Sequence, residues 1–236
     1  VLYAAAWMTW GVDLSIAYRR SGDAANIIAT LAAATIFYVS PWLILTIISG
    51  LILSILIIFR LDLGLALVAL FAPFFFLPKE LFYSAFSMAE LSLIMCGVSF
   101  VINRSAEWRM QNAESRSPLF AIRIPHSALD QAVASLLIVS IIATFLADYK
   151  VFAFRELRVI ILEPIVYYAL IRSAKLDRQA IWRIIDALIL AGTLVAIIGV
   201  IQYAFNINII TAEEGIARLR SVYGSPNNVG LFLGRV

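Results

Sequence analysis

Four ionisable residues lie within one apolar stretch of the chain, residues 151–172 (VFAFRELRVIILEPIVYYALIR). They are Arg155, Glu156, Arg158 and Glu163. At 100° per residue of an α-helix, all four fall on one face that is less than half the circumference wide. An ionisable residue costs about 2.5–3.5 kcal/mol at the centre of a membrane helix, so its presence there indicates a function. Because arginine stays charged and binds phosphate with a bidentate fork, this face predicts a polar pocket for an anion.

The same stretch has a second, simpler interpretation. Arg155, Glu156 and Arg158 could anchor the helix at the membrane interface, where they would snorkel and pair with one another. This does not account for Glu163, which lies about two turns deeper and precedes Pro164. The proline removes a backbone donor, so we expect a kink in the helix toward a cavity.

A second polar group precedes the last apolar run of the chain. Arg218 and Arg220 stand upstream of a Gly-Ser-Pro-Asn turn at residues 224–227. Ser225 or Asn227 could cap the helix that follows, and the amides at the start of that helix would then point outward and attract anions. An ordinary interfacial cap with positive flanks explains the same residues, so physical chemistry alone leaves both interpretations open.

The remaining candidates are weaker. Glu90 and Asp186 are predicted to serve helix packing or the membrane interface, and Asp130 to lie in the first turn of a helix. His126, the only histidine, falls in a polar loop and is predicted to be solvated. Cys96, the only cysteine, lies in an apolar run, which excludes an internal disulfide and a cysteine-based metal site. The sequence has no motif for a metal, a nucleotide or another cofactor, so we expect none.

These residues belong to a chain that is too apolar for a water-soluble domain. Hydrophobic residues make up 63% of the 236 residues and charged residues 14%, against roughly 45–50% and about 25% in soluble domains. A soluble fold would expose large apolar patches, which monomers avoid. The net charge of +3 could suggest a nucleic-acid partner, but the basic residues stand between apolar runs, as membrane topology requires. We therefore predict an all-α, polytopic transmembrane helix bundle in contact with membrane lipids, with no nucleic-acid partner.

About eight crossings are predicted, because a helix needs about 20 apolar residues to span the hydrocarbon core. The long run from Ala24 to Phe59 is split at Ser40–Pro41, because proline cannot continue a helix. The predicted crossings cover residues 24–39, 42–59, 63–77, 86–103, 129–147, 154–172 and 184–205, and an eighth begins near Asn228. They form a single transmembrane domain, 1–236, which we expect to lack a C-terminal loop and further helices.

Basic residues fall mostly on one side of this arrangement. The connections on the side of the N-terminus carry roughly twice as many Lys and Arg residues as those on the other side. Because cytoplasmic loops carry the excess of basic residues, the N-terminus is predicted to be cytoplasmic. The connections at 78–85, 148–153 and 206–227 are then external, and the loop at 104–128 is a solvated cytoplasmic segment.

The last external connection, together with the helix after it, resembles a known family. Its segment at 218–235, RLRSVYGSPNNVGLFLGR, is similar to a signature of the O-antigen ligase and polymerase superfamily. In that signature an arginine, an aromatic–glycine pair and a Pro-Asn precede a membrane helix. Further stretches resemble the same family at 77–80 (LPKE), 86–91 (FSMAEL) and 155–164 (RELRVIILEP). The resemblance implies a C-type glycosyltransferase-like helix bundle in the bacterial inner membrane.

The resemblance also implies an activity. Such enzymes take a glycan from a polyprenyl-pyrophosphate carrier at the outer face of the membrane and need no metal ion or nucleotide sugar. A ligase attaches the glycan to a lipid A–core sugar, and a polymerase attaches it to another carrier-linked glycan. We expect the departing pyrophosphate, on which negative charge builds up, to contact five residues of this chain. They are Arg155, Arg158, Arg218, Arg220 and Asn227.

Several assignments stay open at this point. The base that activates the acceptor hydroxyl could be Glu163, or a histidine of the large external loop that the family carries after the Pro-Asn helix, beyond Val236. The chain alone is therefore expected to be inactive. The choice between ligase and polymerase is also open. The alternatives to both are a transporter or flippase of lipid-linked sugars, for which no internal repeat is found, and a non-catalytic membrane assembly protein.

Overall fold

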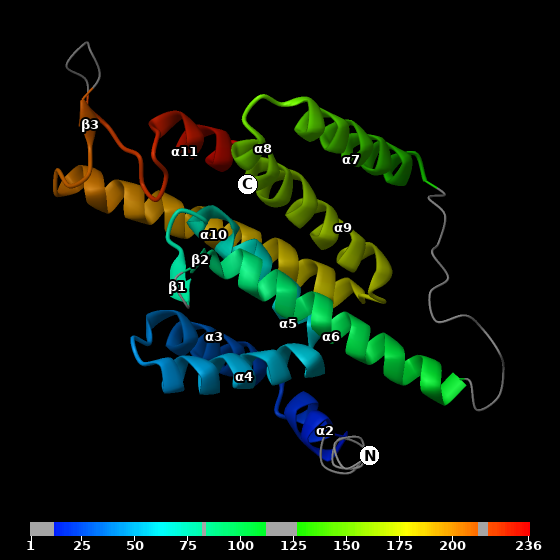
Figure 1. Ribbon diagram of the computed structural model, residues 1–236. Helices are drawn as coiled ribbons and strands as arrows, with labels where there is room; N and C mark the ends of the chain where they lie inside the picture. Colours follow the sequence, from blue (N-terminus) through cyan, green and yellow to red (C-terminus); the bar gives the residue numbers. More distant parts are fainter. Residues whose placement is uncertain (1–11, 82–83, 112–126, 212–216) are drawn as a thin grey trace. The chain divides into compact units, whose positions relative to one another are not determined.

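A computed structural model of the protein describes residues 12–81, 84–111, 127–211 and 217–236. The described chain is mostly helical, as the hydropathy pattern predicts (Figure 1). It divides into two compact units, each described here by itself: unit 1 is Val1–Ser99 with Leu176–Val236, and unit 2 is Phe100–Lys175.

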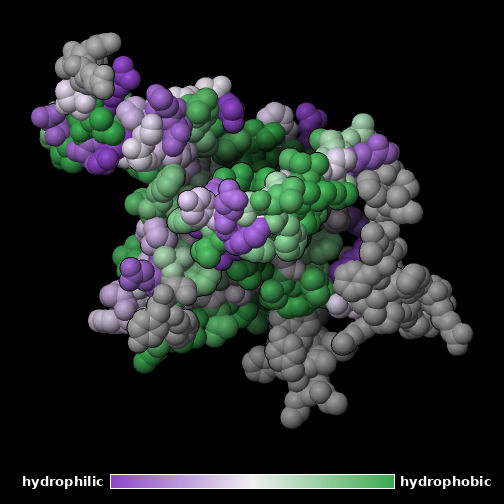
Figure 2. Space-filling model, turned by 45° about the horizontal axis from the view of Figure 1, so that its top comes forward, coloured by the Kyte–Doolittle hydropathy of each residue, from purple (hydrophilic) through white to green (hydrophobic). Residues whose placement is uncertain are grey.

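Three of the described helices are long and apolar enough to cross a membrane. They are Met88–Ser105 within α6 (Met88–Gln111), α7 (Ala128–Leu146) and α10 (Arg178–Ala204). Large apolar side chains are exposed along α4, α7 and α10, and Figure 2 shows hydrophobic residues over much of one face. This surface suits a lipid environment, since soluble monomers avoid such patches.

The first described helix of unit 1 is α2 (Val12–Arg20), which was not among the predicted helices. The helices α3 (Asp23–Val39) and α4 (Leu43–Phe59) follow, and they separate at Ser40–Pro41 as predicted. The pair packs closely where Gly50 faces Phe37, because a Cβ at this glycine would lie 3.0 Å from the phenyl ring.

The centre of unit 1 is α5 (Leu61–Phe71), which continues into a short 3-10 helix, η2 (Ala72–Phe74). Its most extensive contact is with α10. A Cβ at Gly64 would lie 2.7 Å from both the sulfur of Cys96 and a methyl group of Ile57, so only glycine lets α4, α5 and α6 meet there. The Cys96 thiol is free and buried, as predicted.

A small antiparallel hairpin connects η2 to α6. Its strands are β1 (Lys79–Leu81) and β2 (Ser84–Phe86). Lys79, which the sequence analysis placed in an external loop, is buried, and its ammonium group donates to the carbonyl oxygens of Tyr38 (3.1 Å) and Ser40 (2.9 Å). These carbonyls lie at the C-terminal end of α3, in its last turn and at its C-cap, where the helix dipole favours a cation. Burial lowers the pKa of Lys79 from its usual value.

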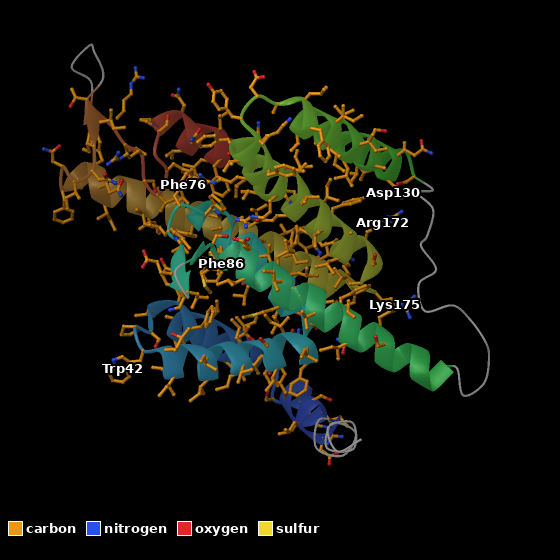
Figure 3. The ribbon with its side chains drawn as sticks, in the orientation of Figure 1. Trp42, Phe76, Phe86, Asp130, Arg172 and Lys175 are labelled. Atoms are coloured by element: carbon orange, nitrogen blue, oxygen red, sulfur yellow. The ribbon has the colours of Figure 1, made fainter. Side chains whose placement is uncertain are left out.

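Unit 2 contains α7, α8 (Lys150–Glu156), the π-helix η3 (Leu157–Leu162) and α9 (Glu163–Ser173). Asp130 lies in the first turn of α7, as predicted, and forms a capping box with Ser127. Its carboxylate also accepts a hydrogen bond from the Tyr168 hydroxyl (2.5 Å) and lies 3.7 Å from Nε of Arg172. Figure 3 labels Asp130 and Arg172, which connect the start of α7 to the end of α9.

The helices lie where crossings were predicted, but several are short. The helices α3, α4 and Leu61–Phe74 are apolar and have 10–17 residues. The prediction of a helical chain is confirmed, although the hairpin β1–β2 and a second one, β3–β4, fill two of the predicted connections. His126 and most of its predicted loop lie outside the described residues.

Candidate functional site

The first group of predicted site residues lies at the C-terminal end of α10, in unit 1. The chain leaves this helix at Phe205 and turns through Asn206 and Asn208, both with positive φ. The two-residue strands β3 (Ile210–Thr211) and β4 (Ala217–Arg218) then pair antiparallel and bring the chain back toward α10 (Figure 1).

Ser221 fixes the returning segment on α10. This residue is buried, has a φ of 49° and donates its hydroxyl to the Val195 carbonyl oxygen (2.6 Å). The side-chain amide of Gln202 donates to the Ser221 carbonyl oxygen (3.2 Å). Gly199 allows the close approach, since a Cβ there would lie 3.0 Å from Leu219.

Only some of the hydrogen-bond donors of the Arg220 guanidinium have a partner among the described residues. One terminal nitrogen donates to the side-chain oxygen of Asn208. Its Nε is buried and has no hydrogen-bond partner among the described residues, and the same holds for Oε1 of Gln202. A buried polar atom without a partner is destabilising unless something else satisfies it. Arg218, by contrast, is exposed on β4.

An aromatic cluster lies next to the segment that carries Arg218 and Arg220. The ring of Tyr223 lies 6.2 Å from that of Phe76 and 6.0 Å from that of Phe232. Burial raises the pKa of Tyr223 to about 12, so its phenol stays protonated near pH 7.

The Gly-Ser-Pro-Asn turn opens α11 (Pro226–Leu233), as predicted. Of the two residues that could cap this helix, the structure selects Ser225, whose side chain accepts a hydrogen bond from the Asn227 backbone (3.3 Å). Asn227 therefore occupies the second helical position, with an exposed side chain. An amide-rich helix start of this kind favours anions.

The second group of predicted site residues lies on one helical run of unit 2. Arg155 is in the last turn of α8, Arg158 is in η3, and Glu163 begins α9 just before Pro164. The two arginines are exposed and Glu163 is half-buried. The expected disturbance beside the proline takes the form of a π-helix, in which the Glu163 amide bonds the Arg158 carbonyl five residues earlier. Such π segments occur often at functional sites.

The π-helix corrects one part of the prediction. The common face of Arg155, Arg158 and Glu163 assumed 100° of rotation per residue, which holds only in an α-helix. A π-helix has more residues per turn, so the predicted angle between Glu163 and Arg155 does not carry over across η3. They nevertheless follow one another along the same helical run.

The predicted arginines are therefore divided between the units. Arg218 and Arg220 belong to unit 1, and Arg155 and Arg158 to unit 2. Their predicted meeting in a single cavity stays a prediction. In the part of the chain that the structure describes, no three His, Cys, Asp or Glu side chains gather as a metal site would require.

A cluster of four charged residues in unit 1 was not predicted. Nη1 of Arg60 lies 2.6 Å from Asp23, and Nη2 lies 2.7 Å from Asp62. Arg183 contacts the same two carboxylates, each at 2.6 Å. The exposed fractions of the Arg60, Asp62 and Arg183 side chains are only 11%, 14% and 16%. We call these four residues the ion cluster.

The sequence held a usable signal for the ion cluster. Asp23, Asp62 and Arg183 each lie close to the start of a helix that the apolar runs predict, and Arg60 lies between two of them. All four fall on the side predicted to be cytoplasmic. The topology rule depends on Lys and Arg residues alone, so it carries no information about Asp23 and Asp62.

Comparisons with protein-family models, with curated proteins and with solved structures found no match to this chain.

Proposed function

We propose that this protein is a membrane glycosyltransferase of the O-antigen ligase and polymerase kind. It takes a glycan from a polyprenyl-pyrophosphate carrier at the external face of the bacterial inner membrane and transfers it to a lipid or glycan acceptor. The resemblance of residues 218–235 and 155–164 to that superfamily is the origin of the proposal. The mostly helical chain with three candidate membrane helices agrees with it.

The observation that carries the proposal is the incomplete pairing of Arg220. Its buried Nε has no partner among the described residues, while the segment around it is held on α10 by Ser221. An N–H donor of a permanently charged group, held in place before a ligand arrives, suits a phosphate oxygen. The capped start of α11 follows five residues later, and its backbone amides also favour a phosphate oxygen.

The proposed chemistry follows from these donors. The acceptor hydroxyl attacks the anomeric carbon of the donor sugar, and the bond from that carbon to the pyrophosphate oxygen breaks. The electron pair leaves with the pyrophosphate, so negative charge grows there in the transition state. Fixed cations that face this charge lower the barrier most in a water-poor site. Arg218 and Arg220 fill that role, with Asn227 beside them at the start of α11.

The helical run of unit 2 completes the proposal. From the resemblance of residues 155–164, Arg155 and Arg158 are proposed to bind phosphate, and Glu163 to accept the proton of the acceptor hydroxyl. The π-helix supports a functional role for this run, because an irregular helix in a membrane is kept where it serves a site. In the proposed topology the chain makes about eight crossings with a cytoplasmic N-terminus, so both groups approach the external face.

The test measures binding of the donor's carrier. The protein in nanodiscs is titrated with a synthetic polyprenyl pyrophosphate, and the variant Arg220→Gln is compared with the unchanged protein. Loss of one charged donor to phosphate should weaken binding on the order of tenfold or more. A membrane-bound transfer assay with a pyrophosphate-linked oligosaccharide then follows glycan transfer in the same variants.

A matched variant separates the site from general charge. Arg178→Gln removes an exposed arginine at the opposite end of α10 and should leave carrier binding unchanged. Arg155→Gln should weaken binding as Arg220→Gln does if the two units share the ligand. Equal affinity for the carrier in the Arg220→Gln and Arg178→Gln proteins would reject the proposed site.

A second candidate function is transport of a lipid-linked sugar. It is favoured by the interruption of the helical run at η3 and Pro164, because transporters use broken helices near their substrate sites. Movement of the lipid-linked sugar across a vesicle membrane without glycan transfer would support this function instead.

A further inference from the structure

An apolar pocket of about 190 Å³ lies between three helices of unit 1, away from the proposed glycan site. Its lining residues recur at helical spacing, for instance Ile27 and Leu31 of α3, Ala66 and Leu70 of α5, and Ala187 and Leu190 of α10. α3 packs chiefly on α4, and α5 on α10, so the pocket is the space left between two helix pairs. Lining of this kind suits a hydrocarbon chain.

The polar end of the pocket has an unusual charge balance. Arg183 lines it, but both of its terminal nitrogens are already paired with Asp23 and Asp62. With Arg60, these residues form the ion cluster, which has two positive and two negative charges and is neutral as a whole. The cluster therefore offers no spare cation to a neighbouring carboxylate.

Asp186 is that neighbouring carboxylate. It lines the pocket, is exposed, and has no hydrogen bond or ion pair with any residue in the described ranges. It lies two turns into α10, about 12 Å along the helix from Arg178. A carboxylate at such a position, without a cation, is unfavourable in a membrane. An amine brought by a ligand would remove this penalty.

We propose that the pocket binds a phospholipid with a primary-amine headgroup, phosphatidylethanolamine. The ammonium group donates hydrogen bonds to the Asp186 carboxylate, and one acyl chain lies along the apolar wall toward the middle of the membrane. Side chains of a helix lean toward its N-terminus, so Asp186 reaches back toward the membrane surface, where headgroups lie. The site is a regulatory or stabilising lipid site and is independent of the proposed glycan transfer.

The experiment measures lipid retention by native mass spectrometry. The protein is purified from nanodiscs that contain phosphatidylethanolamine, phosphatidylcholine and phosphatidylglycerol with the same acyl chains. The primary amine should be retained on the order of tenfold better than either competitor, because a quaternary amine cannot donate a hydrogen bond and a glycerol headgroup has no positive charge.

Three variants decide the outcome. Asp186→Asn removes the charge and Ala187→Phe fills the chain-binding space, and each should abolish the preference for the primary amine. Asp148→Asn, at an exposed carboxylate of unit 2, is the matched control and should keep it. Equal retention of the three lipids by the unchanged protein, or an undiminished preference in the Asp186→Asn and Ala187→Phe proteins, would overturn the proposal.

Discussion

The two ends of α10 treat arginine in opposite ways. Near its start, Arg183 is paired on both terminal nitrogens with carboxylates at 2.6 Å. Beyond its end, the guanidinium of Arg220 donates to the neutral side chain of Asn208, and its Nε is left without a partner among the described residues. The first arrangement is complete without a ligand, and the second is not. A guanidinium that the fold satisfies holds helices together, whereas the partly unpaired guanidinium of Arg220 is the one that we propose as a phosphate ligand.

The largest effect on stability is expected from removing Arg183 from the ion cluster. Arg183→Met leaves Asp23 and Asp62 with only Arg60 to neutralise them, in a cluster where Arg60 and Asp62 are mostly buried and Asp23 is 52% exposed. Removing one partner of a buried ion pair costs about 3–5 kcal/mol. Reversible unfolding in detergent should show a loss of that order in the free energy of unfolding. A loss below about 1 kcal/mol would mean that water reaches and screens the cluster.

A smaller effect on stability is expected at the open end. Arg220→Met removes one bond to a neutral partner and also removes a buried nitrogen without a partner, and these two consequences oppose each other. The free energy of unfolding should change by less than about 1 kcal/mol, while binding of the polyprenyl pyrophosphate is lost. A destabilisation as large as that of Arg183→Met would remove the contrast between the two ends.

A further effect, at Tyr223, depends on pH. Burial raises the pKa of Tyr223 to about 12, against about 10 for an exposed tyrosine. The folded state thus keeps this proton where the unfolded state loses it, so the stabilisation is full below pH 10 and is lost as pH rises to 12. Unfolding measured across this range should decline less steeply in Tyr223→Phe than in the unchanged protein. Identical declines would place the phenol in water.

The positions of the helices were predictable from the sequence because they follow from the hydropathy of the runs and from the proline and capping residues at their ends. Pro41 ends α3, and the Ser-Pro-Asn sequence begins α11 at Pro226. The π-helix before Pro164 was predicted only as a kink, since periodicity supplies one rotation per residue and cannot show where that rotation changes. The hairpins were missed because strands of two or three residues leave no pattern to recognise.

The candidate site was predictable in part, for a different reason. A single ionisable residue in an apolar run, such as Arg155 or Glu163, can be recognised from the sequence alone. Pairing between distant residues cannot, and the ion cluster joins Asp23 to Arg183 across 160 positions of the chain. The burial of Lys79 could not be predicted for the same reason. Its partners are the backbone carbonyls of Tyr38 and Ser40, and a pattern of side chains does not indicate which backbone carbonyls will accept a hydrogen bond.

The brevity of α5 with η2 has a consequence for the membrane itself. Fourteen residues from Leu61 to Phe74 reach only about 22 Å at the rises of α- and 3-10 helices, whereas the hydrocarbon core is about 30 Å thick. If this segment crosses the membrane with its charged start at one surface, its last helical residue, Phe74, lies below the opposite surface. Lipid must then thin around unit 1 or water must descend to it, so polar groups there meet solvent at a depth normally reserved for acyl chains.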